Sequence, residues 1–196
     1  MGTMPHRVEP PDHEKDTATP APGDLELVRG FVALHDHNGD RSVSLAPSAE
    51  TLAWWLREKQ LASPRPNDPE LDWALGVLED LRTKVAENMG APPDERAVAR
   101  LRKAALESGL QVGFGGDRFA VTTRGVRGAI GRLLGISFVA GIDGSWSHLK
   151  ECGSPTCRSV FFDRSRNGSG RWCSMDSCGN RSKVRAFSER ERAAAK

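Results

Sequence analysis

The four cysteines of this chain are the residues whose types and spacing could do chemistry. They form two CxxxxC pairs, Cys152 with Cys157 and Cys173 with Cys178, with fifteen residues between the pairs. Zinc prefers four soft ligands in a tetrahedron, and thiolates carried by two tight turns can supply that geometry. Residues 153–155 (Gly-Ser-Pro) suit the first of these turns. The sequence predicts one structural Zn²⁺ whose shell of four thiolates leaves no open position for a catalytic water.

Two other arrangements of these residues compete with the four-thiolate site. Two disulfides would require an oxidising compartment, but the first twenty residues are polar and proline-rich and contain no apolar signal-peptide core. We therefore expect a cytoplasmic protein with reduced thiols. His148, four residues before Cys152, could replace one thiolate, although with four cysteines present we expect a surface histidine.

The net charge of the 196 residues is +2, and it is unevenly distributed along the chain. Residues 150–196 hold 11 lysines and arginines against 5 aspartates and glutamates, a net charge of +6, which leaves −4 for residues 1–149. An acidic body joined to a basic, cysteine-bearing end indicates two modules, the second facing an anionic partner. A solvated charged tail is the alternative interpretation.

The rest of the chain divides into a leader and a helical body. Residues 1–23 contain five of the twelve prolines, which predicts a disordered leader. Residues 24–145 predict a mainly α domain with one small β-hairpin (α+β). Its helices are expected after a cap at Asp24, after a cap at Ser48, over 69–88, after a cap at Asp94, and over 124–142, with the hairpin over 112–121.

Several features of this body bear on function. Gly128, Gly131 and Gly135 lie at helical spacing, which indicates close packing against a neighbouring helix, with a ligand-approach surface as the alternative. Residues 35–37 (His-Asp-His) could suggest a metal or acid–base site, but a flexible polar turn is the preferred interpretation. The stretch 129–142 is too short to cross a membrane and carries Arg132, so no membrane association is expected. No nucleophile motif, cofactor fingerprint or pair of catalytic carboxylates is present, so we expect no enzyme.

Residues 146–196 predict the zinc finger itself. Strands over 159–163 and 171–172 would be joined by a turn over 164–170, and a helix is expected over 183–195. This order of turn, hairpin, turn and helix is typical of a treble-clef-like zinc finger with a basic C-terminal helix.

Three motifs around the cysteines resemble the CGNR zinc-finger family. They are Asp-Arg-Ser-Arg-Asn at 163–167, Arg-Trp-Cys-Ser-Met at 171–175, and Cys-Gly-Asn-Arg at 178–181. The resemblance implies DNA binding by the finger. It also implies a mostly helical N-terminal domain of the ABATE type over 24–145, in a protein proposed to be a stress-induced transcription regulator.

The residues themselves also suggest how nucleic acid would be bound. Basic side chains cluster around the proposed metal site, and a helix beginning at Gly179 and Asn180 would offer free backbone N–H groups to a phosphate. The candidate nucleic-acid contacts are Arg164, Arg166, Arg171, Asn180, Arg181, Lys183 and Arg185. Asn180, Arg181 and Arg185 are the candidates for reading bases.

Some of these residues have a structural interpretation as well. Arg164 could pair with Asp163, Asn167 could order the turn, and Trp172 is expected to pack beside Cys173. The function expected is zinc-dependent DNA binding in transcription regulation, nucleoid-associated in the cell, with the helical domain sensing a small molecule or contacting a protein. The alternatives are a finger that docks a protein partner or RNA, and a small-molecule-binding domain whose finger is only structural.

Overall fold

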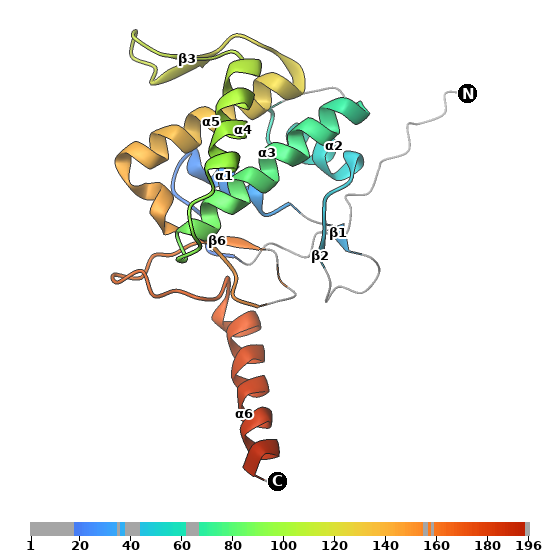
Figure 1. The fold of residues 1–196 in the computed structure, drawn as a ribbon, viewed down its shortest axis with the longest axis vertical. Coiled ribbons are helices and arrows are strands. Elements are labelled where there is room, and N and C mark those ends of the chain that lie inside the picture. The colour runs from blue at the N-terminus through green and yellow to red at the C-terminus, as the bar shows by residue number, and fades with distance from the viewer. Residues whose placement is uncertain are drawn as a thin grey trace, which may run out of the picture.

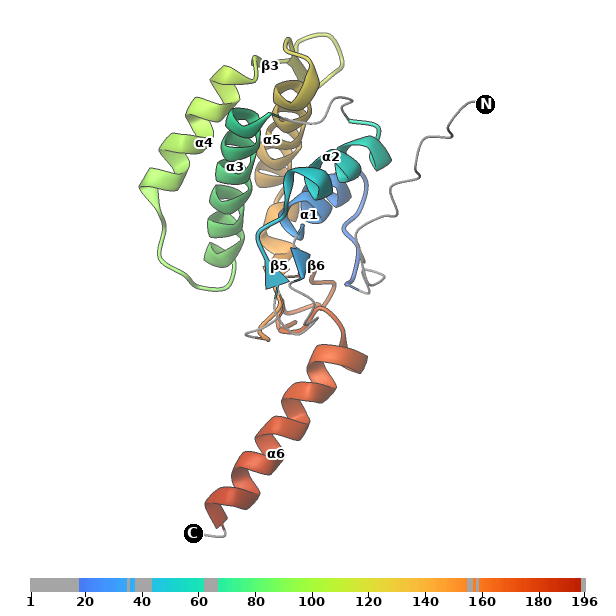
Figure 2. The same ribbon diagram turned by 90° about the vertical axis from the view of Figure 1, so that its right-hand side faces the viewer.

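The computed structural model describes residues 18–34, 36–37, 44–61, 67–154, 157 and 159–194. Within these ranges the protein is mostly helical, as predicted (Figures 1 and 2). The helices are α1 (Leu25–Val32), α2 (Ala49–Glu58), α3 (Asp68–Glu87), α4 (Glu95–Glu107), α5 (Gly125–Asp143) and α6 (Asn180–Ala194), with short turns η1 (Ser145–His148) and η2 (Met175–Gly179). The antiparallel strand pairs are β1 (Asp36–His37) with β2 (Ser44–Leu45), β3 (Leu110–Val112) with β4 (Phe119–Val121), and β5 (Leu149–Glu151) with β6 (Val160–Phe162).

Polar side chains cap two of the three helices for which the sequence predicts a cap. The Ser48 hydroxyl accepts the Thr51 N–H at 3.3 Å, and the Asp94 carboxylate accepts two backbone N–H groups in the first turn of α4. Asp24 does not cap α1, because it lies in a helical conformation itself and its side chain accepts no capping hydrogen bond. Its carboxylate instead lies 3.8 Å from Arg132 of α5.

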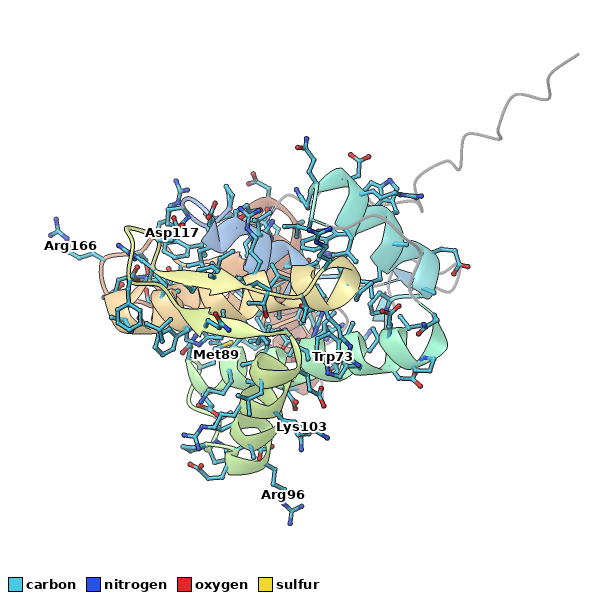
Figure 3. The ribbon with its side chains drawn as sticks, turned by 90° about the horizontal axis from the view of Figure 1, so that it is seen from above. Trp73, Met89, Arg96, Lys103, Asp117 and Arg166 are labelled. Atoms are coloured by element: carbon cyan, nitrogen blue, oxygen red, sulfur yellow. The ribbon has the colours of Figure 1, made fainter. Side chains whose placement is uncertain are left out.

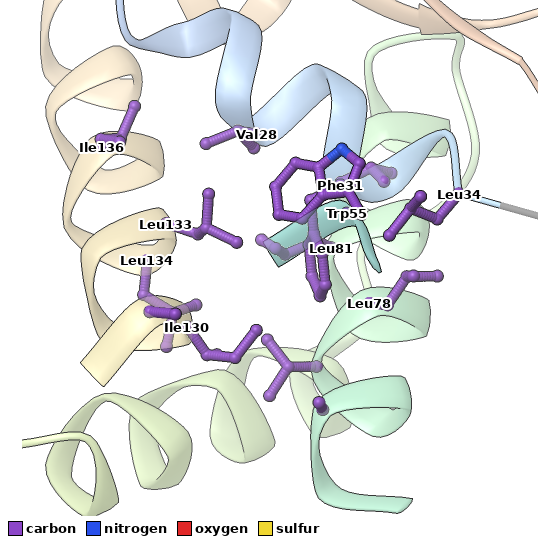
Figure 4. Packing of buried hydrophobic residues seen from close by; sticks show 14 of the residues in the cluster. Val28, Phe31, Leu34, Trp55, Leu78, Leu81, Ile130, Leu133, Leu134 and Ile136 are labelled. Atoms are coloured by element: carbon purple, nitrogen blue, oxygen red, sulfur yellow. The ribbon is translucent and has the colours of Figure 1, made fainter. Parts of the chain in front are cut away.

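The core of the body is formed where α1, α3 and α5 meet (Figure 4). Phe31 of α1 is fully buried and its ring lies 5.7 Å from that of Trp55 in α2. Leu81 of α3 and Leu133 of α5 face the same interior. Burial of each such side chain stabilises the fold by about 1.5–3 kcal/mol, so this cluster is the main source of stability.

The glycines of α5 allow the β3–β4 hairpin to lie directly on the helix. A Cβ added at Gly135 would come within 2.5 Å of the Phe119 ring, and one at Gly131 within 2.8 Å of Ser108. The close packing predicted from the glycine spacing is therefore present, but for these two residues the neighbour includes a β-hairpin.

Among the described residues, α5 is the one helix long and apolar enough to cross a membrane by length and composition. It has 19 residues, as does the helix predicted over 124–142, so the argument from short length, which counted only the apolar stretch 129–142, was wrong. Half of its apolar stretch is buried inside the protein, where it packs against α1, α3 and α4. This is the packing of a core helix.

The β5–β6 hairpin is part of the same core as the helices. Leu149 and Val160 are fully buried in the helical cluster. Arg29 of α1 donates a hydrogen bond from Nη1 to the Val160 carbonyl at 2.8 Å, and Asn88, after α3, donates one to the Leu149 carbonyl at 2.9 Å. The segment that carries the first cysteine pair is thus fixed to the body by both apolar and polar contacts.

Residues 18–23, predicted as the end of the leader, lie against this hairpin. The Thr19 carbonyl accepts the Phe162 N–H at 2.9 Å, and Ala18 is buried in a cluster that includes Cys152 and Phe161. The leader prediction was therefore wrong for these six residues, because Thr19 bonds to β6 and both Ala18 and Ala21 are buried. Residues 1–17 lie outside the described part of the chain.

The turn predicted over 35–37 is partly a strand. Asp36 and His37 pair with Leu45 and Ser44 in the β1–β2 ladder. His35 lies outside the described residues.

Candidate metal centre

The first cysteine pair lies in the connection between β5 and β6. Cys152 follows β5, and its N–H donates to the Ser159 carbonyl at 2.9 Å, which continues the strand ladder. The predicted strand over 159–163 is present as β6, but its partner is β5 and not residues 171–172, which form no strand. The reason is burial: Leu149 and Val160 both enter the main core.

The second pair lies where the chain turns into the long C-terminal helix. Cys173 precedes η2, and Cys178 lies within it, directly before α6. The Gly179 N–H donates to the Ser174 carbonyl at 3.0 Å, and the Asn180 N–H points to carbonyls of η2. The expectation that these two N–H groups would be free for a phosphate is therefore wrong, because η2 extends the helical bonding by one turn.

The two turns bring all four sulfurs together. The four Sγ atoms lie within 4.8 Å of one another, with 3.8 Å between Cys157 and Cys173 and 3.7 Å between Cys173 and Cys178. Four sulfurs bound to zinc at about 2.3 Å in a tetrahedron would be about 3.8 Å apart. The spacing fits a zinc tetrahedron and is far longer than the roughly 2.05 Å of a disulfide bond. The cluster is a site for one zinc ion.

The thiol groups of the cluster share hydrogen bonds when no metal is bound. Hydrogen bonds from Cys152 and Cys173 hold the pKa of the Cys157 thiol far below its usual range. The other two thiols are shifted in the opposite direction. The hydrogen bond to Cys157 raises the pKa of Cys152 to about 11. Hydrogen bonds to Cys152 and Cys157 raise the pKa of Cys173. Zinc must therefore displace protons from at least these two thiols.

Trp172 and His148 lie near the cysteines in the sequence, but neither belongs to the clustered ligand set. Trp172 packs against the cysteine cluster, as predicted, and lies 3.2 Å from the position of a Cβ at Gly153. The exposed His148 ring stacks on Phe162 at 5.2 Å, and its Nδ1 lies 2.9 Å from the Asp163 carbonyl. His148 is thus a surface histidine, as expected, and is not one of the clustered ligands.

A buried ion pair, not predicted from the sequence, organises the loop between the cysteine pairs. Lys150 Nζ lies 2.7 Å from Asp163 Oδ2, and both side chains are less than a tenth exposed. The carboxylate also accepts the N–H groups of Ser165 and Gly170, each at 2.9 Å. Burial opposes ionisation of Asp163, but these hydrogen bonds together hold its pKa below the usual range. A cluster of turn residues following an aspartate was the sequence signal for this loop.

Three of the predicted nucleic-acid contacts have partners within the protein. Arg164 donates to the Pro20 carbonyl at 3.1 Å and does not pair with Asp163. The Arg171 guanidinium lies 5.6 Å from the centre of the Trp172 ring. Arg181 donates from Nη2 to the Cys178 sulfur at 3.3 Å.

All seven predicted residues are exposed, and the other four make few contacts within the described part of the protein. Asn180 makes one long hydrogen bond, 3.4 Å, to the Asp176 carbonyl. Arg166 projects away from the protein (Figure 3), and Lys183 and Arg185 lie on the open surface of α6. The structure gives these last three side chains no ion pair or hydrogen bond with any described residue.

The pattern of the finger is also found by comparison with known families. Residues 148–191 match the family model of the CGNR zinc finger. No curated protein matches the chain. The match covers the hairpin, both cysteine pairs and most of α6, so it bears on the metal centre and leaves the helical body unassigned. The C-terminal segment of this chain is similar to the CGNR zinc finger, and its four cysteines form a site for one zinc ion.

Proposed function

We propose that this protein is a transcription regulator that binds duplex DNA through α6 and the basic surface beside the zinc site. The observation that carries the proposal is the position of α6, which projects away from the body (Figures 1 and 2). Nearly all of its described residues are exposed. A 15-residue helix without tertiary contacts is marginally stable in water, so a helix presented in this way is suited to folding against a partner.

The charge of α6 indicates what kind of partner it fits. The helix carries five lysines and arginines and two glutamates, a net charge of +3. Lys183 and Arg185 have no described intramolecular partner, and neither has Arg166 in the loop before the second cysteine pair. Such side chains bind phosphates and release condensed counterions from nucleic acid. The helical body, whose apolar core encloses the β5–β6 hairpin, would serve as the sensory or interaction module.

The experiment compares two double variants that remove equal charge. Lys183→Gln with Arg185→Gln removes charge from α6, whereas Arg96→Gln with Lys103→Gln removes it from exposed positions on α4 (Figure 3). Binding of a fluorescent duplex of random sequence is measured by anisotropy at several salt concentrations.

We expect the α6 variant to reduce the slope of log affinity against log salt by about 2 and the α4 variant to leave it unchanged. Equal effects of the two variants, or binding that does not depend on salt, would contradict the proposal. Zinc content and circular dichroism check that both variants are folded.

A further inference from the structure

One face of α6 combines apolar and hydrogen-bonding side chains in an unusual order. Asn180, Val184, Phe187 and Glu191 follow one another at steps of four, three and four residues, so they lie along a single face of the helix. Val184 is 66% exposed and Phe187 is 56% exposed. These are large apolar side chains on a helix that extends away from the described body.

Cationic side chains flank this face on both sides, although not symmetrically. Lys183 and Arg190 lie about 70–90° from the centre of the face on one side, and Arg192 and Arg185 lie about 110–130° from it on the other. All four are exposed. An α-helix with its side chains is about 10–12 Å across, and the major groove of B-DNA is about 12 Å wide with a phosphate backbone on each side. The long cationic side chains on the two flanks therefore suit the phosphates on the two walls of that groove.

We propose that α6 lies in the major groove of duplex DNA with Val184 and Phe187 against thymine methyl groups. Apolar side chains contact the thymine C5-methyl group, which is exposed only in the major groove. Asn180 and Glu191, at the two ends of the face, carry the groups that pair with adenine N6/N7 and with the cytosine N4 amino group. The inference rests on the proposed function and adds to it the reading face and the base chemistry that this face recognises.

The zinc site explains why Arg181, in the first turn of α6, is not part of the reading face. Arg181, a predicted base contact, is held by the Cys178 sulfur, and its neighbour Asn180 opens the helix beside η2. The metal site thus fixes the first turn of α6, and the next two turns, which carry Val184 and Phe187, are exposed.

The polar ends of the face favour DNA over a membrane surface. A helix that lies in a bilayer interface buries a continuous apolar face. Here the two apolar residues are flanked by an amide and a carboxylate on the same face. A carboxylate is costly to bury in lipid but can accept a hydrogen bond from a base edge.

The test replaces thymine by uracil, which lacks only the methyl group. Duplexes that bind the full-length, zinc-loaded protein are first selected from a random pool, and each thymine of the selected site is then replaced singly. We expect one or more replacements to weaken binding about fourfold, the effect of burying about one methyl group. Val184→Ala and Phe187→Ala should each reduce this difference while leaving the salt dependence unchanged.

Phe114→Ala is the matched control, because Phe114 is 97% exposed on the distant β3–β4 loop. Salt-dependent binding of DNA that is indifferent to every thymine-to-uracil change would overturn this inference and leave the proposed function standing. Absence of DNA binding overturns both. Binding of phosphatidylserine vesicles that Phe187→Ala abolishes, with DNA binding unchanged by that variant, would assign the face to a membrane and overturn the inference.

Discussion

The Arg181 guanidinium donates a hydrogen bond to the sulfur of Cys178, with 3.3 Å between Nη2 and Sγ. Arg181 follows Cys178 by three residues, and the helical path from η2 into α6 places the guanidinium against the sulfur. That bond, together with the charge of the sulfur, raises the pKa of Arg181. The arginine of the Cys178–Arg181 motif therefore supports the metal site.

Arg181→Met should weaken zinc binding. Outer partners of metal ligands commonly contribute 10- to 100-fold in metal affinity. We expect zinc transfer to a chromogenic chelator to accelerate by at least about tenfold in Arg181→Met. Arg185→Met, which removes the same charge one turn further along α6, should leave the transfer rate unchanged. Equal zinc-transfer rates in the two variants would show that Arg181 does not stabilise the metal site.

Removal of zinc should disturb the helical body as well as the finger. Cys173→Ser takes one ligand from the site, and the β5–β6 hairpin next to it contributes Leu149 and Val160 to the main core. We expect hydrogen exchange to accelerate in the hairpin, in α6 and in the α1 and α3 segments that contact the hairpin. The exposed Ser169→Ala variant serves as control. Acceleration confined to residues after 151 would show that the two parts fold independently.

Asp163→Asn should be strongly destabilising. It leaves the Lys150 ammonium buried without its counterion, which costs about 3–5 kcal/mol in comparable pairs. Folding lowers the pKa of Asp163, so the ion pair stabilises the protein fully at pH values above the ordinary aspartate pKa of about 3.9. This stabilisation is lost as the pH falls from that value through the lowered pKa of the folded protein. Urea unfolding of the zinc-saturated protein at neutral pH measures the loss.

The matched control for this variant is an exposed ion pair. Arg118→Gln removes the partner of Asp143 at 3.8 Å, where both side chains are about half exposed or more. We expect a cost below about 1 kcal/mol. Similar costs at the two sites would contradict the role assigned to the buried pair.

Zinc affinity should rise steeply with pH. The raised pKa values of Cys152, about 11, and of Cys173 mean that both thiols are protonated at neutral pH without metal. Release of at least these two protons per zinc predicts an apparent affinity that increases at least about 100-fold per pH unit. Chelator competition at about pH 6.5 and about pH 7.5 measures this slope. An affinity independent of pH would mean that the ligands are already deprotonated.

The helices and the metal ligands were predictable because their signals are local. Ser48 and Asp94 cap helices according to short-range chemistry, and the cysteine spacing alone places the four sulfurs in two turns. The partner of β6 was not predictable in this way. It depends on Leu149 entering a core built by α1 and α3, which lie far away in the sequence.

The nucleic-acid residues show a second limit of sequence reasoning. Composition predicted surface charge at Arg164, Arg171 and Arg181, and all three are exposed. It did not reveal that each of them also has an intramolecular partner. The Pro20 carbonyl that holds Arg164 is a backbone group, and any residue could supply it. Only the Cys178–Arg181 contact had a readable signal, their i and i+3 spacing on a helix.

The most direct test of the account is zinc X-ray absorption of the purified full-length protein, with metal content measured on the same sample. The account predicts one zinc per chain surrounded by four sulfurs at about 2.3 Å. A metal-free protein whose mass shows two disulfides, or a zinc with nitrogen or oxygen in place of any sulfur, would contradict it.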